Sequence, residues 1–163
     1  MKRLTTAAIP SLALVSLFLL ALPVYASATP STLTFHDVTA SFPVTPMTCP
    51  DGSVIPGGTV TATYNGVIHF NTDSNGGLHF TSTMTASFTL TATTNGIDYS
   101  GHFTTWDGGT VHVTSTGATE FGFTLSVHAT GTDGSTLRFH QDAQFTVNAG
   151  GTVTVNIMNL RCR

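Results

Sequence analysis

The stretch GLHFTSTMTASFTLTATTNGIDYSGHFTTW, residues 77–106, decides the fold class of this chain. Apolar and polar residues alternate along it on both sides of Asn95-Gly96. This period of two is that of a β-strand, because successive side chains point to opposite faces of a sheet. Asn-Gly between two such arms predicts a hairpin closed by a type I′ turn, which requires positive φ at both central residues.

The same alternation recurs along the rest of the chain and predicts about eight strands. The parity of the apolar residues switches at His36-Asp37, which predicts a β-bulge. Asp107-Gly108-Gly109 is expected to form a turn, and Val153, Val155 and Ile157 are expected to face inward. The expected strand segments are 32–44, 59–70, 77–92, 97–106, 111–113, 120–130, 136–148 and 152–160.

An antiparallel up-and-down meander without crossover helices closes into a barrel or folds over as a sandwich. We expect a barrel of lipocalin-like shape, since several segments have ten or more residues. Gly66 and Gly101 also lie at inward positions, where a strongly coiled sheet commonly bends. A two-sheet β-sandwich is the alternative, because strands of this length also bend between two sheets.

Residues 1–28 have the pattern of a secretory signal peptide. Lys2-Arg3 precedes the apolar run 12–22, and the small residues 26–28 form a cleavage site. The apolar run is much shorter than the ~20 residues of a spanning helix. We therefore expect a secreted, extracellular protein with one all-β domain, 29–163, and no membrane segment in its mature form.

The charge of the mature chain limits its partners. The 163 residues less the 28 of the leader leave 135, with no lysine, three arginines and eight carboxylates, a formal charge of −5. A nucleic-acid partner requires clustered lysine and arginine, so this composition excludes one. The oligomeric state is left open.

The two cysteines, Cys49 and Cys162, are expected to form a disulfide, because export takes the chain into an oxidising compartment. Two unpaired buried thiols are the alternative. The bond has a topological consequence, because about seven strands separate the two residues. Either the connection 46–58 runs along the barrel to bring Cys49 across, or one segment is not a full strand.

Histidines gather on the polar face of the predicted sheet. The expected registers place His69 opposite His79, and His112 diagonal to His102. Either pair could offer two imidazoles to zinc or copper, but no carboxylate or thiolate completes a site, so we predict no metal and no cofactor. The histidines on this face are His69, His79, His102, His112, His128 and His140.

Ser126, His140 and Asp142 form a second constellation. Pairing Val127 with Phe139 places Ser126 opposite His140, with Asp142 two positions along the same face. These are the residue types of a hydrolase triad, but a flat strand face supplies no oxyanion hole. The sequence predicts a cross-strand polar cluster here and no catalytic residue.

Trp106 is the one tryptophan of the chain, and an exposed ring there could stack on a sugar or another ligand. The candidate ligand-binding residues are Trp106, His102, His112, Tyr99 and Tyr64.

Three strings carry a resemblance to a known family. They are YNGVIHF at 64–70, SGHFTTW at 100–106 and GTDGSTLRFH at 131–140. With the late cysteine, they resemble a family of small secreted bacterial all-β proteins of unknown function. This resemblance implies no activity.

The leading functional interpretation is non-catalytic binding of a small apolar or sugar ligand, because exported barrels of this size often bind through their mouths or interiors. The alternatives are an extracellular, surface-associated interaction protein and a barrel-type enzyme of the cyclase or isomerase kind. An internal cavity of a few hundred Å³ would favour ligand binding, whereas a filled core would favour the interaction protein.

Overall fold

The computed structural model describes residues 30–74, 76–112 and 118–163, so the predicted leader and its cleavage site lie outside the described residues. The described chain is built of β-strands that pair antiparallel, which confirms the predicted all-β class. The strands are β1 Ser31–Val44, β2 Met47–Thr48, β3 Val54–Ile55, β4 Gly58–Thr72, β5 Gly77–Ala92, β6 Tyr99–His112, β7 Thr119–Gly131, β8 Thr136–Val147 and β9 Val153–Cys162.

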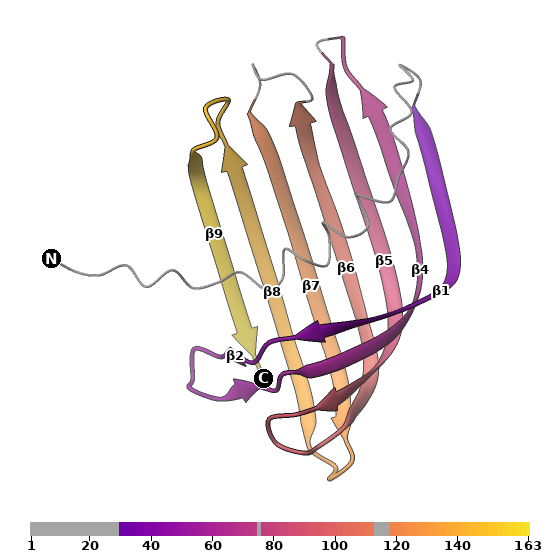
Figure 1. The fold of residues 1–163 in the computed structure, drawn as a ribbon, viewed down its shortest axis with the longest axis vertical. Coiled ribbons are helices and arrows are strands. Elements are labelled where there is room, and N and C mark those ends of the chain that lie inside the picture. The colour runs from indigo at the N-terminus through magenta and orange to yellow at the C-terminus, as the bar shows by residue number, and fades with distance from the viewer. Residues whose placement is uncertain (1–29, 75, 113–117) are drawn as a thin grey trace, which may run out of the picture.

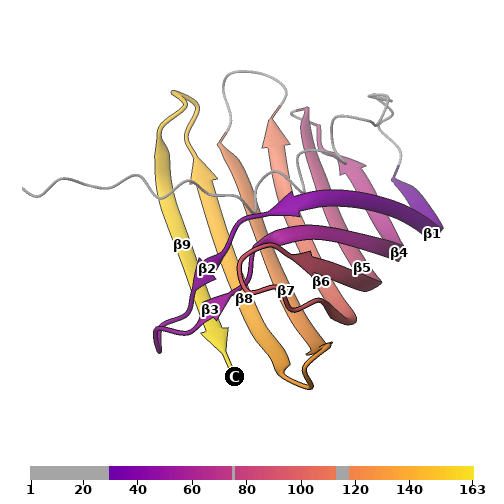
Figure 2. The same ribbon diagram turned by 60° about the horizontal axis from the view of Figure 1, so that its bottom comes forward.

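Seven strands form one sheet in the order β1-β4-β5-β6-β7-β8-β9, and β2 pairs with β3 in a small separate sheet. From β4 onward each strand pairs with the next along the chain, which is the expected meander. The sheet is strongly curled, and the C-terminal half of β1 crosses in front of its lower part (Figures 1 and 2). Within the described ranges β1 and β9 form no ladder with each other, so the predicted closure into a barrel is not confirmed.

The inner face of the curled sheet carries the core. Antiparallel partners point to the same side, so inward side chains lie in rows across the strands. One such row holds Tyr64, Ala86 and Phe103. The ring of Phe103 lies 5.7 Å from that of Tyr64 and 5.8 Å from that of Phe88. The buried cluster is Val60, Ala62, Tyr64, Ala86, Phe88, Leu90, Ala92, Tyr99, Phe103 and Ala129.

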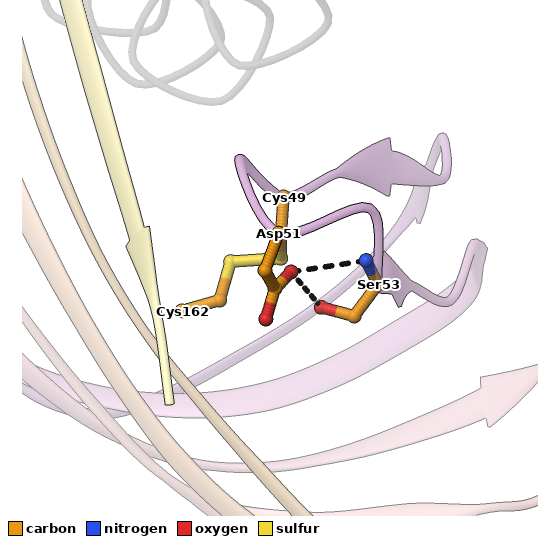
Figure 3. Close-up of a disulfide and its surroundings, with 4 residues drawn as sticks. All are labelled: Cys49, Asp51, Ser53 and Cys162. Atoms are coloured by element: carbon orange, nitrogen blue, oxygen red, sulfur yellow. Dashed lines mark hydrogen bonds between the residues drawn. A yellow bond between two sulfur atoms is a disulfide. The ribbon is translucent and has the colours of Figure 1, made fainter.

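The predicted disulfide between Cys49 and Cys162 is present, with Cα atoms 6.0 Å apart. Cys49 belongs to the β2–β3 hairpin, whereas Cys162 ends the edge strand β9 (Figure 3). Asp51 supports the turn that holds Cys49, because its Oδ1 accepts hydrogen bonds from the backbone N and the hydroxyl of Ser53 at 3.0 and 2.7 Å. The connection after β1 thus carries Cys49 across to the opposite edge of the sheet, one of the two solutions that the sequence allowed.

The predicted bulge at His36-Asp37 is confirmed. The β1–β4 register shifts between Phe35 and Val38, and Asp37 has φ 52°. Its backbone N donates to Asn65 Oδ1 at 3.2 Å, so the partner strand holds the bulged residue in place. The shift keeps apolar residues of both halves of β1 facing inward.

The central hairpin is confirmed, but its turn is not the predicted type I′. Gly96 has φ 70° as expected, whereas among the described non-glycine residues only Asp37 has positive φ, so Asn95 does not. Asn95 instead uses its side chain: Oδ1 accepts from Ile97 N, and Nδ2 donates to the Tyr99 hydroxyl, both at 3.1 Å. These bonds stabilise a wider loop, and strand pairing resumes at Leu90 and Tyr99.

The turn predicted at Asp107-Gly108-Gly109 is wrong, because β6 runs through these residues and pairs on both sides. The glycines permit close approach of neighbouring strands: a Cβ at Gly109 would collide with the Glu120 carbonyl oxygen. The separate strand expected at 111–113 is the end of β6, and Val113 lies outside the described residues.

The expected inward set of the last strand is also wrong. A register shift between Thr146 and Val147 moves the pairing of β9, so Ile157 pairs with Gln144 on the outer face. Met158, which pairs with Ala143, faces inward instead. A one-residue shift exchanges the faces of every following side chain, because the period of a strand is two.

Candidate functional site

Trp106 lies on the outer face of β6, close to the middle of the sheet. Its side chain is 49% exposed, which is unusual for a large aromatic ring. The outer row that contains it runs through Thr124 and Asp142 to Asn159 on β9. Trp106 therefore stands at one end of a line of polar side chains that crosses four strands.

A groove of about 430 Å³ lies beside this row. Its floor lacks side chains at Gly108 and Gly122, which pair directly across β6 and β7. The Trp106 ring covers part of the floor: a Cβ at Gly108 would lie 3.2 Å from Trp106 Cη2. Across the groove, Ile157 on β9 is 47% exposed. The polar residues that line it are Glu120, Thr124, Asp142, Gln144 and Asn159.

The predicted polar cluster is present, and it lies next to this groove. Val127 pairs with Phe139 as expected, and Ser126 Oγ lies 2.7 Å from His140 Nδ1. His140 Nε2 lies 3.0 Å from Asp142 Oδ1, so three side chains form a continuous hydrogen-bonded chain. Asp142 is thereby held at the edge of the groove.

This chain lacks the surroundings of a hydrolase site. Strand β7 is paired on both sides, so the backbone N–H groups around Ser126 are engaged in the sheet ladders and do not form an oxyanion hole. The side chains of His140 and Asp142 are 39% and 34% exposed. The surroundings of these three side chains therefore differ from those of an acyl-transfer site.

A second chain of the same kind was not expected from the sequence. His79 Nε2 lies 3.0 Å from Asp73 Oδ2, and Thr110 Oγ1 lies 2.8 Å from His79 Nδ1. Asp73 also accepts from the backbone N of Gly77 at 2.8 Å and so closes the β4–β5 loop. Asp73 with Gly76-Gly77 indicates a loop in the sequence, but the register of His79 depends on the length of that loop.

The two histidine pairs expected from the sequence are not formed. Strand β5 is displaced by two residues, so His69 pairs with Thr81 rather than with His79. His112 lies far along β6 from His102, which pairs with His128 instead. In the described part of the chain, no group of three or more His, Cys, Asp or Glu side chains is placed to hold a metal ion.

The five residues expected to bind ligand lie on two faces. Trp106, His102 and His112 point outward, whereas Tyr64 and Tyr99 are buried in the core at 2% and 7% exposure. Burial raises the pKa of Tyr64 to about 12. The two tyrosines therefore support packing, and Trp106 is the member of the set that lines the outer groove.

The sequence did not predict a buried carboxylate at Asp107, because a turn was expected there. It points inward beside Ser82 and is 3% exposed. Burial raises its pKa to about 6, although the hydroxyls of Ser82 and Thr105 act in the opposite direction.

Comparison of the chain with protein-family models, with curated proteins and with solved structures gives no match. Among the described residues no helix is long and apolar enough to cross a bilayer. The disulfide is consistent with an oxidising compartment.

Proposed function

We propose that the protein binds neutral carbohydrate, without catalysis, in the outer groove beside Trp106. The observation that carries this proposal is the half-exposed indole ring, which lies over Gly108 next to a floor without side chains. The apolar face of a sugar ring packs well on an indole, and the indole N–H offers a hydrogen bond at the edge.

The polar rim suits the hydroxyls of such a ligand. Thr124, Gln144 and Asn159 supply hydroxyl and amide groups that both donate and accept. Asp142 and Glu120 bring negative charge to the groove, which disfavours acidic sugars. Small-molecule sites combine an apolar surface with a few placed polar groups in this way.

The groove differs from the interior site of a lipocalin. Two hollows lie on the outer face of the described sheet, the groove beside Trp106 and a second one beside His102 and Thr104, and we place the ligand in the first of them. We also propose that the protein is secreted, which the signal-peptide pattern supports. We further propose that the sheet closes in the manner of a lipocalin, which is supported by its curl and by the disulfide between the β2–β3 hairpin and β9.

Titration with neutral glycans tests the proposal, because the described domain contains one tryptophan and its emission reports on the groove. We expect a saturable emission change with at least one glycan of a panel, at a Kd of about 1 mM or lower. Trp106→Ala should abolish binding measured by calorimetry. His128→Ala, on the same face but outside the groove, should bind as the wild type does. A panel without any response up to about 10 mM would contradict the proposal.

A second candidate is an interaction surface formed by hydroxyls. The outer face of β5 presents six exposed hydroxyl side chains in alternation, and β4 continues the pattern. A pull-down in which Thr83→Lys and Thr85→Lys remove an extracellular partner, while Trp106→Ala does not, would support this surface over the groove. The six hydroxyl residues are Thr81, Thr83, Thr85, Ser87, Thr89 and Thr91.

A further inference from the structure

A cluster of buried oxygen atoms lies on the inner face, away from the outer groove. Ser82 and Asp107 are direct partners across β5 and β6, and Thr105 precedes Asp107 by one inward position. Gln141 lies in the row of Thr105, two strands away. Ser82, Asp107 and Gln141 are 5%, 3% and 1% exposed.

These oxygens lack well-formed hydrogen bonds in the described structure, although the hydroxyls of Ser82 and Thr105 are close enough to Asp107 to lower its pKa. Ser82 Oγ, Thr105 Oγ1 and Gln141 Oε1 are buried atoms without a hydrogen-bond partner in the described structure. Buried polar atoms are rarely left unpaired, and a group of them commonly marks a bound water or ion. Two of these atoms, the hydroxyl oxygens of Ser82 and Thr105, lie beside the single buried carboxylate of Asp107.

The carboxylate also lacks a protein cation. The inward-facing positions of β4 to β9 hold no lysine, arginine or histidine, and their other titratable side chains are Tyr64 and Tyr99. A buried charge without a partner is strongly unfavourable. Above a pH of about 6, where Asp107 is ionised, the inner positions of β4 to β9 therefore hold one negative charge without a protein cation.

We propose that Asp107, Ser82 and Thr105 bind a small monovalent cation such as sodium. One positive charge balances the single carboxylate and leaves the inner face neutral. A divalent ion would leave a buried excess charge, and calcium usually takes several carboxylates among six to eight oxygens. Hydroxyl and amide oxygens are ligands that hard cations accept.

The hydroxyls fit this role because each has lone pairs to spare. A hydroxyl that donates its proton toward Asp107 still presents two lone pairs to a cation. Phe123, which pairs with Asp107 on the other side, is 7% exposed and helps to keep water away. Weak shielding by solvent strengthens the attraction between carboxylate and cation.

Thermal unfolding in sodium chloride and in choline chloride at equal ionic strength tests the inference, because the methylated nitrogen of choline cannot be coordinated closely by oxygen ligands as sodium is. For the wild type we expect sodium to raise Tm by about 5 °C over choline at about 200 mM, with saturation. Sodium NMR should show a broadened signal that narrows when Asp107→Asn replaces the wild type. Asp98→Asn removes an exposed carboxylate elsewhere and should behave as the wild type does.

Two results would overturn the inference. Equal Tm values in sodium and choline would mean that no sodium ion binds at Asp107. A sodium effect that persists in Asp107→Asn would place the ion elsewhere. Ser82→Ala distinguishes loss of the site from misfolding, since it keeps the carboxylate and should weaken sodium binding several-fold. None of these measurements depends on carbohydrate binding.

Discussion

The Cα atoms of Cys49 and Cys162 lie 6.0 Å apart, although β1 and β9 are the opposite edges of a seven-stranded sheet. The chain achieves this contact by curling the sheet and by extending the β2–β3 hairpin from the end of β1 toward β9 (Figure 1). The disulfide thus ties the hairpin that follows β1 to the opposite edge strand, β9, although no backbone ladder connects β1 with β9 in the described ranges.

Loss of this bond should destabilise the fold strongly. The two cysteines are 113 residues apart, and closing so long a loop destabilises the unfolded state by about 5 kcal/mol on the chain-entropy model. We expect Cys49→Ser with Cys162→Ser to lower the free energy of unfolding by that order, measured by urea denaturation. The reduced wild type should match the double variant, and alkylation of both thiols in the unreduced protein would contradict the bond.

The loop of the central hairpin depends on the backbone of Gly96. Its φ of 70° is strongly disfavoured for a β-branched residue, although a Cβ there would meet no atom within 4 Å. Gly96→Val should therefore cost more than ~1 kcal/mol through backbone strain alone. Calorimetry can compare it with Thr94→Val, in the same loop, which should leave Tm nearly unchanged. Equal melting of the two variants would argue against this loop conformation.

Filling the outer groove should separate binding from folding. Gly122 has no positive φ, and its Cβ would sit at an ordinary 3.6 Å from the Ala143 carbonyl oxygen. Gly122→Val should keep or slightly raise Tm, because valine suits a strand better than glycine. Glycan affinity should fall at least tenfold. Unchanged affinity in calorimetric titration would mean that the ligand does not use this floor.

Asp107 should make stability fall as the pH rises. Its pKa is raised from 3.8 to about 6 in the folded state, so between these values the folded protein holds a proton that the unfolded chain has released. The stabilisation that the Asp107 proton gives is fully present below about pH 4 and is lost as the pH rises through 6. The free energy of unfolding should fall by about 3 kcal/mol over this range. The difference in unfolding free energy between wild type and Asp107→Asn, measured in choline buffers from pH 4 to 8, should follow this curve. A flat difference would contradict a buried acid.

Much of the fold could be predicted from local pattern. The alternation along residues 77–92 fixes which side chains point inward, and the parity switch at Asp37 predicts the bulge that the structure contains. The contact of Ser126 with His140 also followed from the pairing of Val127 with Phe139. Each of these predictions depends on neighbours that apolar periodicity identifies.

The errors arise where pattern does not determine register. Gly108 and Gly109 suggest a turn by composition, yet they lie within a strand. There they allow the neighbouring strands to approach closely and form part of the groove floor. No parity switch marks the irregularity between Thr146 and Val147, because Val153, Val155 and Ile157 keep one parity through it, so the face of Ile157 was misassigned. The buried oxygen atoms around Asp107 could not be predicted, because the burial of Asp107 depends on which strands flank it.

The separation of aromatic residues between the two faces gives this protein two independent optical signals. Trp106 is already half in water when the chain is folded, so its emission should change little on unfolding and should respond mainly to molecules at the outer face. Tyr64 and Tyr99 are packed in the core, and their near-ultraviolet dichroism should disappear with tertiary packing. A melt followed by tryptophan emission alone would therefore underreport unfolding, whereas tyrosine dichroism would follow the core directly.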